Sequence, residues 1–247
     1  HGLNFAGMCA ALRAAPAGTI VALHACCHNP TGVDLGIDQW REVARICQER
    51  NLVPMLDIAY QGFGEGVDAD AAAVRLFADA GLSFFVASSF SKSFSLYGER
   101  VGALTIVTAS SDESARVLSQ LKRIIRTNYS NPPAHGGSVV AAVLADPRLR
   151  AMWEEELAEM RNRIKAMRSA LVEGLKARGV KGDFSYMLRQ NGMFSYSGLS
   201  PAQVEQLRNE FGIYAVSTGR ICVAALNTRN IDYVCDALAA LAALSRG

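Results

Sequence analysis

The chain alternates short apolar runs with segments in which apolar residues recur at helical spacing. The apolar runs have the length of β-strands and lie at residues 19–23, 52–56, 83–87 and 102–108. Between them, residues 38–51 and 70–80 place apolar side chains every three or four positions, which is typical of amphipathic helices. This alternation predicts an α/β fold with a largely parallel sheet, whose ligands bind beyond the carboxyl ends of the strands.

The pattern changes beyond residue 147. Asp38 is the predicted N-cap of the first helix, and Gly81 closes the second. Residues 148–178 then form one long helical stretch that ends at Gly179. The elements expected after it are a short strand at 193–196, a helix opened by Ser200 and Pro201, strands near Ile213 and from Ile221 to Leu226, and a last helix from Ile231.

The composition excludes several classes of function. The 247 residues carry 25 basic and 23 acidic side chains, and no basic run indicates binding to nucleic acid or to an anionic membrane. Half of the residues are hydrophobic, yet no apolar run approaches the ~20 residues of a membrane span. We find no signal-peptide pattern, and because the chain opens at His1 we expect a processed or truncated sequence.

The cysteines indicate a reducing compartment. All six, at positions 9, 26, 27, 47, 222 and 235, are irregularly spaced and include an adjacent pair, which is typical of reduced thiols in the cytoplasm. Segment 24–28 combines two cysteines with two histidines and raises the alternative of a metal site. Adjacent side chains of a strand point to opposite faces, however, and no second Cys/His cluster supplies further ligands. We therefore predict buried cysteines and no metal.

A single lysine, Lys92, stands among five serines and two phenylalanines in residues 88–100, directly after an apolar strand. In a semi-apolar pocket its ammonium would lose solvation and its amine would become accessible, as a Schiff-base lysine requires. The alternative is a lysine whose stem packs on the phenylalanines while its head reaches water. Ser89 and Lys92 also match the Ser-x-x-Lys pattern of penicillin-binding acyltransferases, but that chemistry needs a helix, which Gly98 and the serines disfavour.

Polar side chains follow three of the predicted strands. Asn29 lies after the first, Asp57 and Tyr60 after the second, and Lys92 after the third. An amide, a carboxylate, a phenol and an amine on neighbouring strand ends can converge on one polar, ring-shaped ligand with a carbonyl group. Residues 62–66 are rich in glycine but lack the Gly-x-Gly-x-x-Gly spacing, and no helix start follows them directly, so we interpret them as a loop.

Several motifs resemble the pyridoxal-phosphate (PLP) aminotransferases of the aspartate and aromatic-amino-acid group. They lie at residues 26–32, 57–63, 89–100, 128–136 and 192–196. The resemblance covers essentially the whole chain. It is strongest to the bacterial aromatic, or tyrosine, branch, which has near counterparts of residues 96–100 and 220–224.

The resemblance assigns roles around the cofactor. Lys92 would hold PLP covalently and then act as the base that moves the substrate proton. Asp57 would pair with the pyridine nitrogen and keep it protonated, while Tyr60 and Asn29 would hydrogen-bond the ring oxygen. Tyr97 fits either a core or a pocket position and receives no role.

Three arginines complete the expected site. Arg100 and Ser89 would hold the phosphate, and Arg220 would grip the α-carboxylate of the substrate with its planar fork. Arg126 would meet a distal carboxylate, reaching the site from the neighbouring subunit. As alternatives, Arg126 would belong to a solvated helix face and Arg220 would be the edge charge of a strand.

The family implies an aspartate aminotransferase-like fold, with a large PLP-binding domain at residues 1–158 and a small α+β domain at 159–247. It also implies a homodimer with shared active sites that acts on amino acids and 2-oxo acids. Its members carry a further N-terminal stretch that these residues lack, with a phosphate loop, a ring-stacking aromatic residue and a tyrosine given to the partner, so we expect a fragment. The function implied is an aromatic-amino-acid aminotransferase; the alternatives are an aspartate aminotransferase and, more remotely, the PLP-sensing domain of a regulator.

Overall fold

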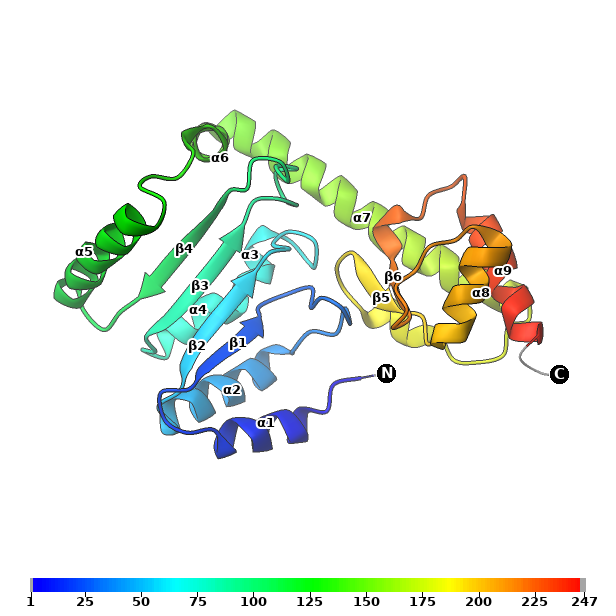
Figure 1. The fold of residues 1–247 in the computed structure, drawn as a ribbon, viewed down its shortest axis with the longest axis horizontal. Coiled ribbons are helices and arrows are strands. Elements are labelled where there is room, and N and C mark those ends of the chain that lie inside the picture. Colours follow the sequence, from blue (N-terminus) through cyan, green and yellow to red (C-terminus); the bar gives the residue numbers. More distant parts are fainter. Residues whose placement is uncertain (1, 245–247) are drawn as a thin grey trace. The chain divides into compact units, whose positions relative to one another are not determined.

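The computed structural model describes residues 2–244, which form two compact units (Figure 1). The sheet unit consists of Asn4–Cys26 and Leu35–Leu157. The C-terminal unit consists, within the described range, of residues 2–3, 27–34 and 158–244. Each unit is described by itself below.

A four-stranded sheet is the centre of the sheet unit. Its strands are β1 (Ile20–His24), β2 (Val53–Ile58), β3 (Phe84–Ser89) and β4 (Gly102–Val107), in the order β1-β2-β3-β4 (Figure 1). The β1-β2 and β2-β3 pairs are parallel, and β4 pairs with β3 in the antiparallel direction. The predicted α/β fold with a largely parallel sheet is confirmed, and the four strands lie where the apolar runs placed them.

Helices surround this sheet. They are α1 (Phe5–Ala14), α2 (Ile37–Glu49), α3 (Val67–Asp70), α4 (Ala72–Asp79), α5 (Ser111–Asn128) and α6 (Ala134–Ala145). Packing of large rings joins α2 and α4 to the sheet, because Phe77 meets both Trp40 and Phe84 edge-on, with ring centroids 5.9 and 5.7 Å apart. All three rings are buried, so the apolar stripe predicted for α2 does face the core.

The predicted start of α2 is wrong by two residues. Gly36 is the N-cap, because its carbonyl accepts the first helical bond from the Trp40 N–H at 3.0 Å. The N–H of Gly36 donates to the side-chain oxygen of Gln39 at 2.9 Å. Asp38 lies inside the first turn, where its exposed carboxylate pairs with Arg41.

The single helix predicted over residues 70–80 is interrupted at Ala71, giving α3 and α4. The reason is the buried carboxylate of Asp70, which accepts the backbone N–H groups of Gly62, Gly64 and Glu65 at 2.8–2.9 Å. Residues 62–66 are a loop, as interpreted. A short helix does follow them directly, contrary to the expectation from sequence.

The long helix α7 (Pro147–Ala177) confirms the helix predicted over 148–178, and the division between the units falls within it, after Leu157. The C-terminal unit continues with the 3₁₀ turns η1 (Ser185–Arg189) and η2 (Val223–Ala225), the antiparallel strands β5 (Phe194–Tyr196) and β6 (Arg220–Cys222), and helices α8 (Pro201–Phe211) and α9 (Ile231–Leu244). Ser200 caps α8 with a hydrogen bond to the Gln203 N–H, as its sequence predicted.

One predicted strand of the C-terminal unit is wrong, and another is confirmed but shorter than predicted. Ile213 is not in a strand, because its N–H bonds the Leu207 carbonyl at 3.1 Å and completes the cap of α8 after the left-handed Gly212. The strand that starts at Arg220 ends at Cys222, since the N–H of Val223 bonds the Met193 carbonyl at 2.8 Å and the chain turns into η2. No helix within residues 2–244 is long and apolar enough to cross a bilayer.

Candidate functional site

Lys92 lies in a turn three residues beyond β3 and is half-buried between the buried serines Ser91 and Ser93. Its ammonium nitrogen lies 4.7 Å from the centre of the Tyr60 ring and 5.9 Å from that of Tyr97. Residues 90–100 contain no helix, so the geometry required by the Ser-x-x-Lys alternative is missing. Tyr97, which received no role from sequence, is thus a neighbour of the lysine.

Aromatic packing from α7 fixes this turn. The indole N–H of Trp153 donates to the Ser93 carbonyl at 2.6 Å, and its ring stacks on Phe94 with centroids 4.5 Å apart. Phe94 in turn meets Phe90 edge-on at 5.5 Å. The backbone beside Lys92 is therefore held by half-buried contacts that do not use the lysine side chain.

Asp57 lies at the carboxyl end of β2, directly opposite His24 of β1 in the sheet register. The His24 Nε2 and Asp57 Oδ2 atoms are 3.9 Å apart, and the Asp57 side chain is 43% exposed. Tyr60 follows two residues after the end of β2 and is buried. His24 was considered from sequence only as a metal ligand; its place beside Asp57 became visible through the pairing of the strands.

Ser89 and Arg100 stand at the two ends of a hairpin connection between β3 and β4. Ser89 pairs with Gly102, and the Phe90 N–H bonds the Val101 carbonyl at 3.2 Å, so the two chain segments run side by side at its neck. Arg100 has a left-handed backbone (φ 54°), and its exposed guanidinium donates to the Tyr97 carbonyl at 3.1 Å. Lys92 lies within this connection.

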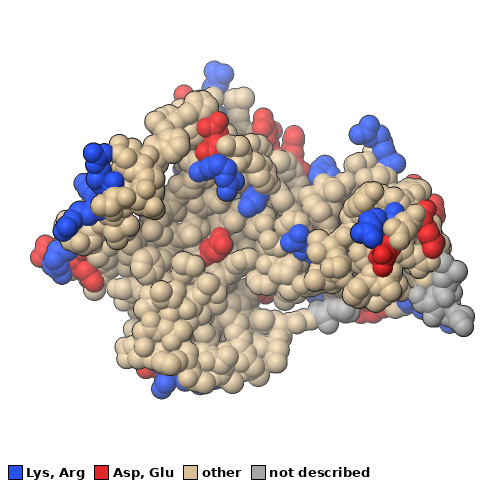
Figure 2. Space-filling view, in the orientation of Figure 1, with Lys and Arg blue, Asp and Glu red and all other residues tan. Residues whose placement is uncertain are grey.

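Arg126 lies in the last turn of α5, where its guanidinium donates to the hydroxyl of Ser130. No residue of α5 is buried, and lysine and arginine side chains gather over this helix in Figure 2. The contact of Arg126 is thus local to an exposed helix end.

Asn29 and Arg220 meet within the C-terminal unit, although 191 positions separate them. Arg220 donates from Nη1 to the Asn29 Oδ1 at 3.1 Å, and its guanidinium carbon lies 4.6 Å from the centre of the Phe194 ring. This guanidinium is half-buried and held by an amide and an aromatic face, which differs from the free edge charge considered as the alternative.

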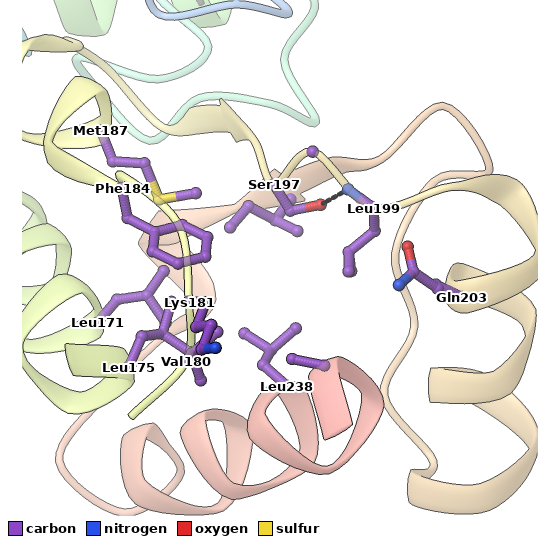
Figure 3. Close-up of a pocket in the computed structure, with 13 residues that line it drawn as sticks. Leu171, Leu175, Val180, Lys181, Phe184, Met187, Ser197, Leu199, Gln203 and Leu238 are labelled. Atoms are coloured by element: carbon purple, nitrogen blue, oxygen red, sulfur yellow. Dashed lines mark hydrogen bonds between the residues drawn. The ribbon is translucent and has the colours of Figure 1, made fainter. Parts of the chain in front are cut away.

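An apolar cavity of about 230 Å³ also lies in the C-terminal unit (Figure 3). Leu171 and Leu175 of α7, Phe184 and Leu238 form much of its wall. None of the predicted site residues lines it. Ile221 does, and because neighbouring residues of a strand face opposite ways, this separates the cavity from the side of β6 that carries Arg220.

Apart from Arg126 at the end of α5, the predicted site residues therefore fall into two groups. Asp57, Tyr60, Ser89 and Lys92 lie at the carboxyl ends of β2 and β3 in the sheet unit, with Arg100 at the neck of the same hairpin. Asn29 and Arg220 form a second group in the C-terminal unit. An amine over a phenol ring, near a carboxylate and a hydroxyl, is a donor set suited to an aldehyde-bearing, phosphorylated heterocycle.

Comparison with known proteins decides the family. The family model for aminotransferases of class I and II matches residues 1–238. The chain belongs to the class I and II aminotransferases. The family expected from the sequence motifs is thus confirmed, and it covers both units.

Relatives of this aminotransferase-family chain carry two kinds of name. An aspartate aminotransferase of Pseudomonas aeruginosa is 67% identical over 238 residues, which are 96% of this chain and 60% of the relative. An aromatic-amino-acid aminotransferase of Escherichia coli is 54% identical over 241 residues, 98% of this chain and 61% of the relative. The chain thus spans about 60% of the length of these curated relatives.

A solved relative gives the same fold. The aromatic-amino-acid aminotransferase of Burkholderia pseudomallei, whose crystal structure is covalently bound to pyridoxal phosphate, matches with a TM-score of 0.96 at 71% sequence identity. The match covers 97% of this chain and 60% of that one. The fold of this class I and II aminotransferase is therefore the aspartate aminotransferase-like fold of its relatives.

Proposed function

We propose that the protein is a PLP-dependent transaminase that transfers the amino group between an aromatic L-amino acid and a 2-oxo acid such as 2-oxoglutarate. The observation that carries the proposal is the position of the Lys92 amine, 4.7 Å over the Tyr60 ring at the sheet edge that also holds Asp57 and Ser89. The names of the relatives support the reaction class, and the PLP bound to the solved relative supports the cofactor.

The donor chemistry of the residues fits PLP. Lys92 offers a primary amine to an aldehyde, and Asp57 offers a carboxylate to a pyridinium N–H. Ser89 and Arg100, at the two ends of the hairpin connection, offer a hydroxyl and a guanidinium to a phosphate. In the C-terminal unit, the Asn29 oxygen accepts from Arg220, and we assign the amide N–H of Asn29 to the ring oxygen.

These residues would divide the work of the reaction. Bound PLP supplies a protonated ring that accepts the electrons left behind when the substrate loses its α-proton. Asp57 keeps that ring protonated through its negative charge, and Tyr60 donates to the ring oxygen. The Lys92 amine would hold PLP covalently and, when free, would act as the base that moves the substrate α-proton. Arg220 binds the substrate carboxylate with the nitrogens that Asn29 does not occupy.

The same site would accept acidic substrates as well as aromatic ones. We assign Arg126 to the distal carboxylate of aspartate or 2-oxoglutarate, supplied across a homodimer in the cytoplasm. Relatives named aspartate aminotransferase and relatives named aromatic-amino-acid aminotransferase match almost the same length of this chain, so an aspartate aminotransferase is the second candidate. The division into domains at residues 1–158 and 159–247 belongs to the same proposal.

Replacement of Lys92 tests the reaction class. In the full-length protein, Lys92→Ala should lose transaminase activity with every amino acid, because it removes the amine that lies over Tyr60 and that we assign to the cofactor. Lys176→Ala, in the exposed last turn of α7, is the matched control and should keep the wild-type rate. Borohydride reduction followed by peptide mass spectrometry should place the cofactor on Lys92. Attachment to Lys122 or Lys165 would contradict the assignment.

A substrate comparison tests the preference. Steady-state kcat/KM for phenylalanine, tyrosine and aspartate, each with 2-oxoglutarate, should favour the aromatic donors while keeping measurable activity on aspartate. A preference for aspartate by more than tenfold would favour the second candidate function. Binding of PLP without any turnover would instead indicate a sensor domain.

A further inference from the structure

One charged side chain of the C-terminal unit is buried without an acidic partner. Arg168 on α7 is only 3% exposed. No carboxylate within residues 2–244 lies at ion-pair distance from its guanidinium. Burial lowers the pKa of Arg168 to about 10, an effect that the nearby Cys27 and Asp34 oppose, so the side chain remains charged at neutral pH. Burying a charge is costly unless its hydrogen bonds are well satisfied.

Neutral acceptors from residues 187–195, a segment that runs from η1 through a loop into β5, satisfy this charge. The Nη2 atom donates to the carbonyls of Gly192 and Phe194, both at 2.7 Å. The Nη1 atom donates to the Ser195 hydroxyl at 3.2 Å and, more weakly, to the Met187 carbonyl at 3.4 Å. Because the guanidinium is planar and its donors point in fixed directions, these bonds define the course of residues 187–195.

Contacts of Phe194 connect Arg168 to Arg220. Arg168 holds the Phe194 carbonyl, and the ring of Phe194 lies under the Arg220 guanidinium at 4.6 Å. Phe194 also pairs with Cys222, two residues after Arg220, in the β5-β6 register. A shift of the Phe194 backbone would therefore move the aromatic face on which Arg220 rests.

Contacts of residues 191 and 192 connect Arg168 to Asn29, the hydrogen-bond partner of Arg220. The Asn191 N–H bonds the Gly32 carbonyl at 2.8 Å, so the loop held by Arg168 lies against the segment 27–34 that carries Asn29. The contact has no spare room, since a Cβ on Gly192 would lie 2.6 Å from the Cβ of Cys27. Asp34 braces the same segment by accepting the N–H groups of Cys27 and His28, both at 2.8 Å.

We propose that Arg168 is a positioning residue for Arg220, holding both of its supports, the Phe194 ring and the Asn29 amide, from inside the C-terminal unit. The inference rests on the proposed role of Arg220 in binding the substrate carboxylate. A purely structural role would lower stability and leave ligand selectivity unchanged. A positioning role changes how well Arg220 discriminates a carboxylate from an uncharged group.

The test compares two ligands that differ only in this group. Dissociation constants of 3-phenylpropanoate and 3-phenylpropanamide are measured by calorimetry on the full-length, PLP-loaded protein. The wild type should prefer the acid. Arg168→Lys keeps the charge but loses the planar fork, and it should reduce that preference by about 2- to 30-fold by weakening the acid. Arg178→Lys is the matched control and should keep the preference for the acid, because Arg178 directly follows α7 and its side chain bonds Asp232 and Asp236.

Ser195→Ala provides a milder variant in case Arg168→Lys does not fold, because it removes one acceptor of the Arg168 guanidinium and leaves the charge in place. It should shift the acid-to-amide preference in the same direction. An unchanged preference in the folded variant, with lowered thermal stability alone, would overturn the positioning role. If the wild type itself binds both ligands equally, it is the proposed role of Arg220 that fails.

Discussion

At the scale of single residues, burial gives two cysteines of this chain different reactivity. Cys47 on α2 is fully buried, whereas Cys222 at the end of β6 is exposed. Burial penalises the charged thiolate and raises the pKa of Cys47 to about 11. Reactivity with alkylating reagents follows the thiolate and its access to solvent, so these two cysteines should behave differently.

We therefore expect iodoacetamide at pH 8 to label Cys222 well before Cys47 in the native protein. With a pKa near 11, only ~0.1% of the Cys47 thiol is ionised at this pH, and no path from solvent reaches it. Peptide mass spectrometry over a time course measures both sites, and unfolded protein should label at both. Equal native rates would show that α2 opens readily or does not pack as described.

At the scale of elements, the carboxylate of Asp70 holds the loop after Tyr60 in place. Asp70 accepts three backbone N–H groups of residues 62–65 and is itself buried, which also ends α3. An Asn at this position keeps the volume but presents an N–H₂ group to backbone donors. When one acceptor is removed from a buried hydrogen-bond network, the donors left without a partner keep their desolvation cost and destabilise the fold.

Asp70→Asn should lower the free energy of unfolding by ~1–3 kcal/mol, the usual cost of a buried donor left without its acceptor. Thermal unfolding of the full-length protein measures the loss as a fall in Tm. The exposed Asp68→Asn, two residues away, removes the same charge without touching the loop and should leave Tm nearly unchanged. A fall in Tm of similar size in both variants would mean that loss of the negative charge, and not loss of the loop hydrogen bonds, causes the destabilisation.

At the scale of the whole molecule, helix α5 leaves apolar side chains exposed that a second subunit would cover. Its apolar residues recur at helical spacing, yet none is buried; Leu118 and Ile124 are 50% and 60% exposed. Leu104 of the edge strand β4 is 55% exposed as well. Open apolar surface of this kind is typical of a face covered in the assembled protein. Arg126, which we assign to the substrate site of a neighbouring subunit, ends the same helix.

Mixed dimers test that assignment. In a hybrid of a Lys92→Ala subunit with an Arg126→Ala subunit, one site would combine the intact Lys92 of one chain with the intact Arg126 of the other. Random mixing should restore about one quarter of the wild-type sites for aspartate, as expected for a two-fold dimer. Each variant alone should be nearly inactive on aspartate. No recovery in the hybrids would mean that Arg126 serves its own subunit or no site at all.

The sequence by itself determined the elements whose signals are local. The long apolar stripe of α7, the Ser200 cap of α8 and the four apolar strand runs were all predictable, because spacing and capping act within a few residues. The positions of Lys92, Asp57 and Tyr60 at the ends of strands were also predictable, since each follows an apolar run that the sequence marks clearly.

Tertiary structure alone decided which of these groups meet and where regular elements break. Strand pairing set His24 opposite Asp57, and folding of the C-terminal unit joined Asn29 to Arg220 across 191 positions. The break at Ala71 likewise comes from hydrogen bonds to a loop five to eight residues earlier. Such contacts carry no local pattern, because their energy depends on partners that only the folded chain brings within hydrogen-bond distance.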